Sequence, residues 1–342
     1  MSVRRLLPAL LAASLAACSG NDVPEVHLYT WDSYDDPEIF AEFEMRTGVR
    51  VVVDVFASNE ELFAKLSGGA RGYDVIAPSD YMVTAMSKAG LLAELDRPKL
   101  PNLKHMDPRF MDLPYDPKNA YSVPYMWGIT GIGYDSDAVS PPPEGWSDLF
   151  DEKNRGRISL LNDQREAFAM ALQSLGYPAG ERSPQRLREA QKKLLKQKPL
   201  VKTYISENIE PLLVSGEIPI AHAWSGDINR AAREKPSLRF VIPKEGGILW
   251  QDNLCVPKTA ANPSAAYQLI DFLLEPANMA RLVPKVGFGC PNRAAYELLP
   301  PELRANPTLV PQDAVLKRLQ WIPYAGETAP LLDQLWTELK AS

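Results

Sequence analysis

The sequence predicts an α/β fold in which a mostly parallel β-sheet is covered by helices on both faces. After residue 25, strand-like runs of apolar and β-branched residues alternate with helix-like segments. Strands that are joined by helical crossovers run parallel, so this alternation favours a parallel sheet. The 342 residues, of which 45% are hydrophobic, are enough for two lobes of ordinary domain size. The first predicted strands are 26–29, 49–56 and 73–77, and the predicted helices between and after them are 37–46, 58–67 and 81–89.

Local signals mark the start and the end of each of these helices. Pro37 occupies the first turn of the first helix, and Gly48 ends it. Ser58 and Glu61 form a capping box at the start of the second helix. The third helix ends at Gly90. Strand and helix therefore alternate three times before residue 91.

Residues 121–134, YSVPYMWGITGIGY, are apolar, aromatic and interrupted by glycines. They predict extended chain, either as a crossover between two lobes or as one long strand with a bulge. The basic residues of the predicted helix 184–197 indicate a solvated face, with a docking surface as the alternative. The remaining predicted strands are 157–161, 218–224, 239–243 and 248–256, and the remaining predicted helices include 167–175, 265–274, 278–286 and 331–341.

Residues 1–17 are predicted to be a lipoprotein signal peptide that does not belong to the fold. Arg4 and Arg5 precede an apolar run that is too short to cross a bilayer. The run ends in Leu-Ala-Ala-Cys18, which resembles the lipobox of bacterial lipoproteins, where cleavage exposes the cysteine for lipid attachment. An ordinary cleavage site followed by an unrelated cysteine is the alternative. Residues 18–25 would then form a short tether to an exported domain.

Composition excludes several classes of function. The signal segment carries two arginines and no acid, so its removal changes the formal net charge from −6 to −8, which argues against nucleic acid as a partner. Three histidines and the absence of a Cys/His cluster predict no metal site, and no cofactor motif is present. Export permits a disulfide between Cys255 and Cys290, with two separately buried thiols as the alternative.

Acidic and aromatic residues recur together at the ends of the predicted strands. Ligands of open α/β sheets bind outside the carboxyl ends of the strands, so these residues are candidates for one site. Helix N-capping is the alternative for each acid, and it explains Asp80 and Asp163 equally well. It explains Asp252 less well, because another strand-like run follows that acid. The groups are Trp31-Asp32-Ser33-Tyr34, Ser79-Asp80-Tyr81, Asp163 with Glu166, Trp224 with Asp227, and Trp250 with Asp252.

Carboxylates and aromatic rings together suit a ligand that carries several positive charges. Carboxylates that converge in one cleft repel one another and raise one another's pKa, and a bound polycation removes this repulsion. Aromatic faces attract ammonium groups and cover the methylene segments between them. The sequence therefore predicts a slot with Trp and Tyr along its sides and carboxylates at its ends.

Seven longer motifs are spread over the chain between about residue 26 and residue 341. They are YTWDSYDDPEIFAEFEMRTG, SNEELFAKL, YDVIAPSDY, SVPYMWGITGIGY, DQREAFAMALQSLGY, PKEGGILWQDNL and CPNRAAYELL. Together they resemble the spermidine/putrescine-binding proteins of bacterial polyamine ABC importers. The resemblance implies a two-lobed clamshell of the type II periplasmic-binding-protein class with two crossovers between the lobes. One lobe would contain 25–128 plus 251–296, and the other 129–250 plus 297–342.

The resemblance also implies ligand-binding residues, among which Asp252 is the first candidate for an amine contact. Three features depart from the family's pattern. Asp32 and Ser33 stand in the reverse of the family's order of hydroxyl and acid, and Phe288 replaces a tyrosine. Asp227 resembles members of the putrescine type. The positions that match are Trp31, Tyr34, Ser79, Tyr81, Asp163, Glu166, Ser206, Trp224, Trp250 and Asp252.

The function that the resemblance implies is that of a monomeric binding lipoprotein without a cofactor. It would capture a polyamine outside the cytoplasm, remain anchored to a membrane through Cys18, and deliver the ligand to an ABC permease. Spermidine is favoured over putrescine because Trp250 and the DQRE segment resemble the spermidine type. The alternatives are another cationic amine or amino acid, a sensor, or an enzyme that uses Asp163 and Glu166 as an acid/base pair.

Overall fold

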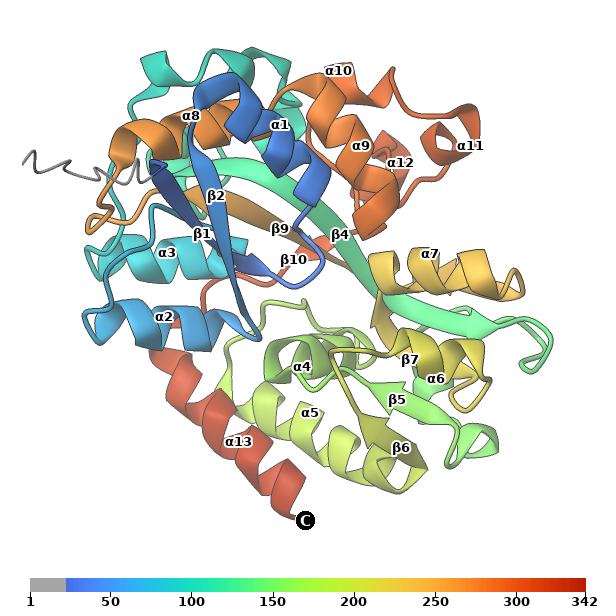
Figure 1. Ribbon diagram of the computed structural model, residues 1–342. Helices are drawn as coiled ribbons and strands as arrows, with labels where there is room; N and C mark the ends of the chain where they lie inside the picture. The colour runs from blue at the N-terminus through green and yellow to red at the C-terminus, as the bar shows by residue number, and fades with distance from the viewer. Residues whose placement is uncertain (1–22) are drawn as a thin grey trace, which may run out of the picture.

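One ten-stranded sheet continues through two lobes in the computed structural model (Figure 1). Residues 23–342 are described, so the predicted signal peptide, Cys18 and most of the predicted tether lie outside the described residues. The strands are β1 (Glu25–Trp31), β2 (Arg50–Phe56), β3 (Val75–Ile76), β4 (Ser122–Asp135), β5 (Ile158–Leu160), β6 (Val201–Tyr204), β7 (Ile220–Trp224), β8 (Leu238–Val241), β9 (Ile248–Cys255) and β10 (Gln320–Trp321). Their order is β2-β1-β3-β9-β4-β7-β5-β6, with β10 beside β9 and β8 beside β4.

The first lobe has the predicted alternation of strand and helix. β1 pairs in parallel with β2 and β3. Asp36 caps the first helix by accepting from the backbone amides of Glu38 and Ile39, and Gly48 ends it with a positive φ of 71°. Ser58 accepts from the amide of Glu61, as the capping box predicts. The helices of this lobe are α1 (Pro37–Thr47), α2 (Asn59–Ser67), α3 (Asp80–Lys88), α8 (Pro263–Leu273), α9 (Pro276–Val286), α10 (Arg293–Tyr296) and α11 (Pro301–Arg304).

Two long strands connect the lobes. β4 and β9 pair antiparallel from Ser122 opposite Cys255 to Thr130 opposite Ile248, with a register irregularity between Pro124 and Met126. Both interpretations of residues 121–134 therefore apply, because one long bulged strand is also the crossover. β1, β2 and β3 are parallel to one another, as are β5, β6 and β7, whereas β3 pairs antiparallel with β9 and β4 pairs antiparallel with β7, β8 and β9.

The second lobe has its own parallel strands. β5 pairs in parallel with β6 and β7, and β7 pairs antiparallel with β4. Helix α5 has the predicted bounds, and most of its basic residues are exposed, as the prediction of a solvated face requires. The helices of this lobe are α4 (Gln164–Gln173), α5 (Pro184–Gln197), α6 (Glu210–Val214), α7 (Ser225–Glu234) and α13 (Ala329–Ala341).

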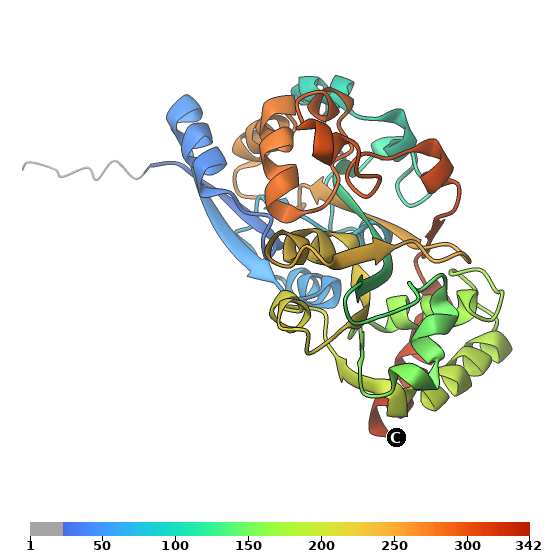
Figure 2. The same ribbon diagram turned by 90° about the vertical axis from the view of Figure 1, so that its right-hand side faces the viewer.

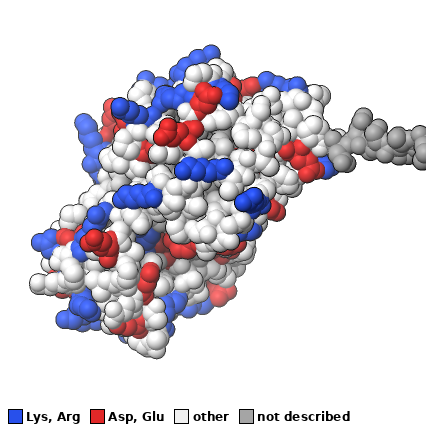
Figure 3. Space-filling view, turned by 90° about the vertical axis from the view of Figure 1, so that its left-hand side faces the viewer, with Lys and Arg blue, Asp and Glu red and all other residues white. Residues whose placement is uncertain are grey.

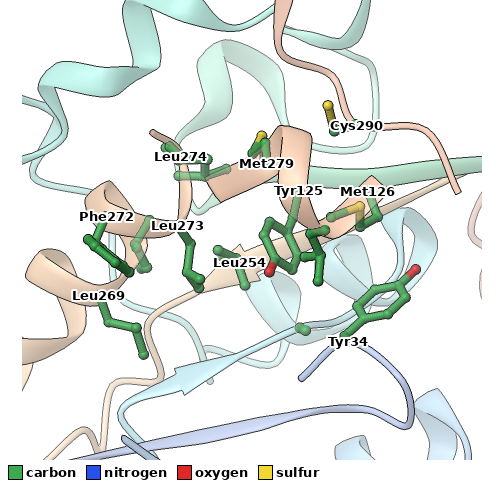
Figure 4. Packing of buried hydrophobic residues seen from close by; sticks show 14 of the residues in the cluster. Tyr34, Tyr125, Met126, Leu254, Leu269, Phe272, Leu273, Leu274, Met279 and Cys290 are labelled. Atoms are coloured by element: carbon green, nitrogen blue, oxygen red, sulfur yellow. The ribbon is translucent and has the colours of Figure 1, made fainter. Parts of the chain in front are cut away.

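Each lobe is built around a hydrophobic core of its own. Figure 4 shows the core of the first lobe, where Tyr125, Met126 and Leu254 of the central strands pack against residues of α8 and α9 such as Leu273 and Met279. The core of the second lobe contains buried side chains from β5, α4, α5 and α13. Figure 2 shows the same division, with α8 and α9 in the upper lobe and α13 in the lower one.

The C-terminal segment contributes to the hydrophobic cores of both lobes. Leu299 and Leu309 are buried in the same cluster as α8 and α9, so the chain around residues 297–310 packs with the first lobe. The chain then forms α12 (Asp313–Leu316) and pairs β10 in parallel with β9 before α13 enters the second lobe. Residues around 297–310 thus share the hydrophobic cluster to which α8, α9 and α10 contribute.

The two cysteines of the described residues do not form a disulfide. Cys255 and Cys290 are buried free thiols, so of the two alternatives for this pair the structure has separate thiols. On the face shown in Figure 3, basic and acidic side chains are interspersed over both lobes.

Within residues 23–342, no helix is both long enough and apolar enough to span a membrane. The same residues contain no cluster of His, Cys, Asp and Glu that could hold a metal ion.

Candidate functional site

A cavity of 520 Å³ lies between the lobes, and every site residue that the sequence predicts lines it. Trp31 and Trp224 are the last residues of β1 and β7, so the strand ends converge on the cavity as the parallel sheet requires. The structure thus brings the predicted residues together, although their roles toward a ligand stay a prediction. They are Trp31, Asp32, Ser33, Tyr34, Ser79, Tyr81, Asp163, Glu166, Ser206, Trp224, Asp227, Trp250, Asp252 and Phe288.

Asp252 is held in the wall of the cavity by neutral donors. It lies within β9, so it is not a helix cap, and only 4% of its surface is exposed. The Ser79 hydroxyl donates to Oδ1 at 2.6 Å, and the Tyr34 hydroxyl donates to Oδ2 at 2.7 Å. Burial raises the pKa of Asp252 to about 6, and the two hydroxyl donors oppose this rise. A cation beside Asp252 would therefore gain a preorganised acceptor.

Asp163 and Glu166 lie at the start of α4 and have different roles. Asp163 is the helix N-cap and accepts from the amides of Arg165 at 2.8 Å and Glu166 at 3.1 Å. Glu166 is buried, and its Oε2 has no hydrogen-bond partner among the described residues. Burial, together with the neighbouring charge of Asp163, raises the pKa of Glu166 to about 8. A buried carboxylate without a partner is costly unless a ligand satisfies it.

Arg165 and Asp80 also line the cavity; Asp80 is one of the acids predicted at the strand ends, whereas Arg165 was not among the predicted site residues. The Arg165 guanidinium lies 3.7 Å from the centre of the Tyr81 ring and donates to the carbonyls of Ile322 and Pro323. Asp80 accepts from the amide of Gln251 at 3.2 Å, and burial raises its pKa to about 7. Asp80 is not the cap of α3, because residue 79 occupies that position.

Asp227 forms an ion pair with a side chain of its own helix. The Arg230 Nη2 donates to Asp227 Oδ1 at 2.6 Å, and Arg230 also contacts Glu210. Burial nevertheless raises the pKa of Asp227 to about 7, with Arg230 opposing the rise. Arg230 and Glu210 were not among the predicted site residues, although the spacing of three residues between Asp227 and Arg230 on a helix places these two on one face.

Aromatic rings form the walls of the cavity. The ring centres of Trp250 and Phe288 lie 4.8 Å apart in an edge-to-face arrangement, and Phe288 also contacts Tyr34. A Cβ atom at Gly128 would lie 2.2 Å from the Trp250 ring, so only glycine permits Trp250 to pack over β4. Phe288 thus provides a wall although it lacks the hydroxyl of the tyrosine that the resemblance implied.

The turn after β1 contains the irregular pair of the sequence. Asp32 is exposed while Tyr34 is buried, and Ser33 between them has a φ of 69°. Asp32 therefore lines the cavity where it is open to solvent. On the opposite lobe, the Ser206 hydroxyl is buried without a partner among the described residues. Both groups are available to a ligand that extends beyond Asp252.

Negative charge dominates the lining of the cavity. Its acidic residues outnumber its basic ones, Arg165 and Arg230, by nine to two. At an effective dielectric constant of about 20, each pair of charges 4 Å apart contributes about 4 kcal/mol, so such a cluster favours a polycation. The acids are Asp32, Glu60, Asp80, Asp163, Glu166, Glu207, Glu210, Asp227 and Asp252.

Comparison with known proteins identifies the family of the chain. The family described as bacterial extracellular solute-binding protein matches residues 38–311. The chain is 36% identical to the spermidine/putrescine-binding periplasmic protein of Escherichia coli, over 99% of this chain and 98% of the relative. It is 35% identical to spermidine/putrescine-binding periplasmic protein 1 of Haemophilus influenzae, over 98% of this chain and 97% of the relative.

A solved structure agrees with the sequence relatives. The spermidine/putrescine ABC transporter substrate-binding protein PotD from Streptococcus pneumoniae is similar to this chain with a TM-score of 0.83 and 32% identity, over 93% of this chain and 99% of that one. The fold is therefore that of the periplasmic solute-binding clamshells, whose members bind and carry solutes and are not enzymes. The chain belongs to the family of bacterial extracellular solute-binding proteins that includes the spermidine/putrescine-binding periplasmic proteins.

Proposed function

We propose that the protein binds a polyamine between its two lobes, with spermidine favoured over putrescine, and delivers it to an ABC permease. The observation that carries this proposal is the convergence of nine carboxylates and several aromatic rings on one cavity of 520 Å³. Ammonium groups would pair with the carboxylates, and the aromatic rings would cover the methylene segments. The names of the similar proteins point to the same class of ligand.

The proposed preference for spermidine rests on Glu166, Asp252 and Asp32, which line the cavity and have no salt bridge to a basic side chain among the described residues. Glu166 has an oxygen without a partner among the described residues, and Asp252 accepts only from neutral hydroxyls. Asp32 lies where the cavity meets solvent. We propose that the three ammonium groups of a triamine pair with these three acids, whereas a diamine would leave one of them without a positive partner.

Delivery and anchoring complete the proposal. We propose that lipid attachment at Cys18 holds the protein at a membrane outside the cytoplasm, and that the protein acts as a monomer. Closure of the lobes over the ligand would create the surface that the permease recognises, because the ligand contacts both lobes only in the closed form. Capture and delivery of the ligand would then need only opening and closure of the lobes and no chemical reaction.

Calorimetric titration of the mature protein with putrescine, cadaverine, spermidine and spermine tests the proposal. We expect a micromolar or lower Kd for spermidine, which corresponds to a binding free energy of about −8 kcal/mol or a more negative value. Putrescine is expected to bind more weakly. Binding of none of the four amines would reject the polyamine proposal, and stronger binding of putrescine would reject the order of preference.

Binding is expected to release protons near pH 7. Burial raises the pKa of Asp252 to about 6 and that of Glu166 to about 8 in the protein without ligand. A bound ammonium stabilises the ionised carboxylates and lowers both pKa values, so the affinity should decrease as the pH falls from about 8 to about 5. Calorimetry in buffers of different ionisation enthalpy measures the released protons, and a pH-independent affinity would contradict the placement of these acids beside the ligand.

A further inference from the structure

The cavity contains a cation of its own at the end where Asp227 lies. Arg230 of α7 donates from Nη2 to Asp227 Oδ1 at 2.6 Å and from Nε to Glu210 Oε1 at 2.8 Å. Its Nη1 donates to the carbonyl of Val286 at 2.5 Å. One guanidinium thus contacts two carboxylates in the lining of the cavity, with a geometry that an ammonium ligand would otherwise use.

The other acids of the cavity are not paired in this way. Asp252 accepts from two hydroxyls, and Glu166 has an oxygen without a partner among the described residues. Arg165, the other guanidinium of the lining, donates to backbone carbonyls and stacks on Tyr81. Arg230 is therefore the guanidinium that hydrogen-bonds carboxylates within this cavity.

Arg230 also lies close to the central anchor of the site. Its guanidinium carbon is 5.7 Å from the centre of the Phe288 ring, and the same ring packs on Trp250 and Tyr34. Tyr34 in turn donates to Asp252. Two aromatic side chains, Phe288 and Tyr34, thus separate Arg230 from the acid that we expect to hold an amine, so a ligand that extends past Phe288 would approach the pair of Asp227 and Arg230.

We propose that Arg230 is a specificity-determining residue that limits the number of amines in the ligand. Its guanidinium occupies the place where a further ammonium would pair with Asp227 and Glu210. The inference rests on the proposed polyamine-binding function and assigns Asp227 the role of a partner for Arg230 instead of an amine contact. An additional ligand amine at this end would meet a resident positive charge, which acts as a repulsive element against longer polyamines.

Removal of Arg230 has a second effect that the experiment must separate. Arg230 belongs to the second lobe, and the Val286 carbonyl that it contacts lies at the end of α9 in the first lobe. Loss of this contact would change the affinity for every ligand by a similar factor. The ratio of affinities between ligands is therefore the informative quantity. Arg233→Met is a matched control, because Arg233 contacts the Pro284 carbonyl of α9 but does not line the cavity.

The test is calorimetric titration of the mature protein and its Arg230→Met variant with putrescine, spermidine and spermine at a pH of about 8. We expect the affinity for spermine relative to putrescine to rise by about tenfold in Arg230→Met, because the two freed carboxylates can pair with additional ammonium groups. The increase in affinity for spermidine should lie between those for putrescine and spermine. Arg230→Lys retains the charge and should keep the original ratio, as should Arg233→Met.

A double variant separates binding of a ligand ammonium beside Asp227 and Glu210 from the general effect of removing one positive charge. Asp227→Asn added to Arg230→Met should cancel most of the gain for spermine, because it removes one of the two carboxylates that Arg230→Met frees. A spermine-to-putrescine ratio that rises less than about threefold in Arg230→Met would overturn the inference. If the unmodified protein binds no polyamine, the proposed function fails first, and this outcome is distinct from an unchanged ratio in a protein that binds.

Discussion

Replacement of Asp252 by Asn is expected to weaken spermidine binding by at least about tenfold, or about 1.4 kcal/mol. The substitution keeps the size of the side chain and one acceptor for the hydroxyls of Ser79 and Tyr34, which now contact Asp252 at 2.6 and 2.7 Å. It removes the negative charge that is buried beside the aromatic walls. Calorimetric titration of the mature variant with spermidine measures the effect.

A control separates the loss of this contact from the loss of one negative charge in an acidic protein. Asp54 is exposed on β2 and does not line the cavity, so Asp54→Asn removes the same charge at a distance. This control should leave the affinity within about twofold, because exposed charges are screened by salt over about 10 Å. A decrease of less than tenfold in Asp252→Asn would show that no ligand amine pairs with Asp252.

Replacement of Glu166 by Gln is expected to weaken ligand binding and to stabilise the protein that has no ligand. Burial raises the pKa of Glu166 to about 8 in the folded protein, well above the value of about 4.3 in an unfolded chain. Because the folded state holds the proton more tightly, ionisation of Glu166 lowers the free energy of unfolding as the pH rises through this interval. Glu166→Gln should therefore raise the free energy of unfolding at a pH of about 8 by on the order of 2 kcal/mol.

Urea denaturation of the ligand-free proteins at a pH of about 8 and of about 4 measures this effect, because the difference should disappear at the lower pH, where Glu166 is protonated in both states. Glu234→Gln, at the exposed end of α7, is the matched control and should change neither the stability nor the affinity. A variant that is stabilised but binds spermidine as tightly as the unmodified protein would show that Glu166 is buried for a reason other than the ligand.

Local sequence signals were sufficient for the elements of the first lobe. Pro37, Gly48 and the capping box at Ser58 specify helix ends through contacts within a few residues, so α1 and α2 begin and end close to the predicted positions. The recurrence of acids and aromatics at strand ends was also sufficient to predict the lining of one cavity, because a parallel sheet collects its strand ends at one edge.

Contacts between distant parts of the chain could not be predicted in this way. The sequence of residues 297–310 has no local feature that selects one hydrophobic core, whereas in the structure Leu299 and Leu309 are buried in one cluster with residues of α8 and α9. The same limit applies to β4, whose two interpretations became one only when its pairing with β9 was known. Apolar residues specify that they are buried, but not which of two cores receives them.

The charges of the site show most clearly which properties follow from the sequence and which depend on the tertiary structure. The sequence by itself determined that the protein has an α/β fold with aromatic residues and carboxylates at the strand ends, since both follow from local pattern and composition. Only the tertiary structure decided which carboxylates retain an unpaired charge. Arg230 pairs with Asp227 and also contacts Glu210 and Val286, which lie 20 and 56 residues from Arg230 in the sequence. An ion pair depends on distances in space, and these are set by the packing of α6, α7 and α9 against one another.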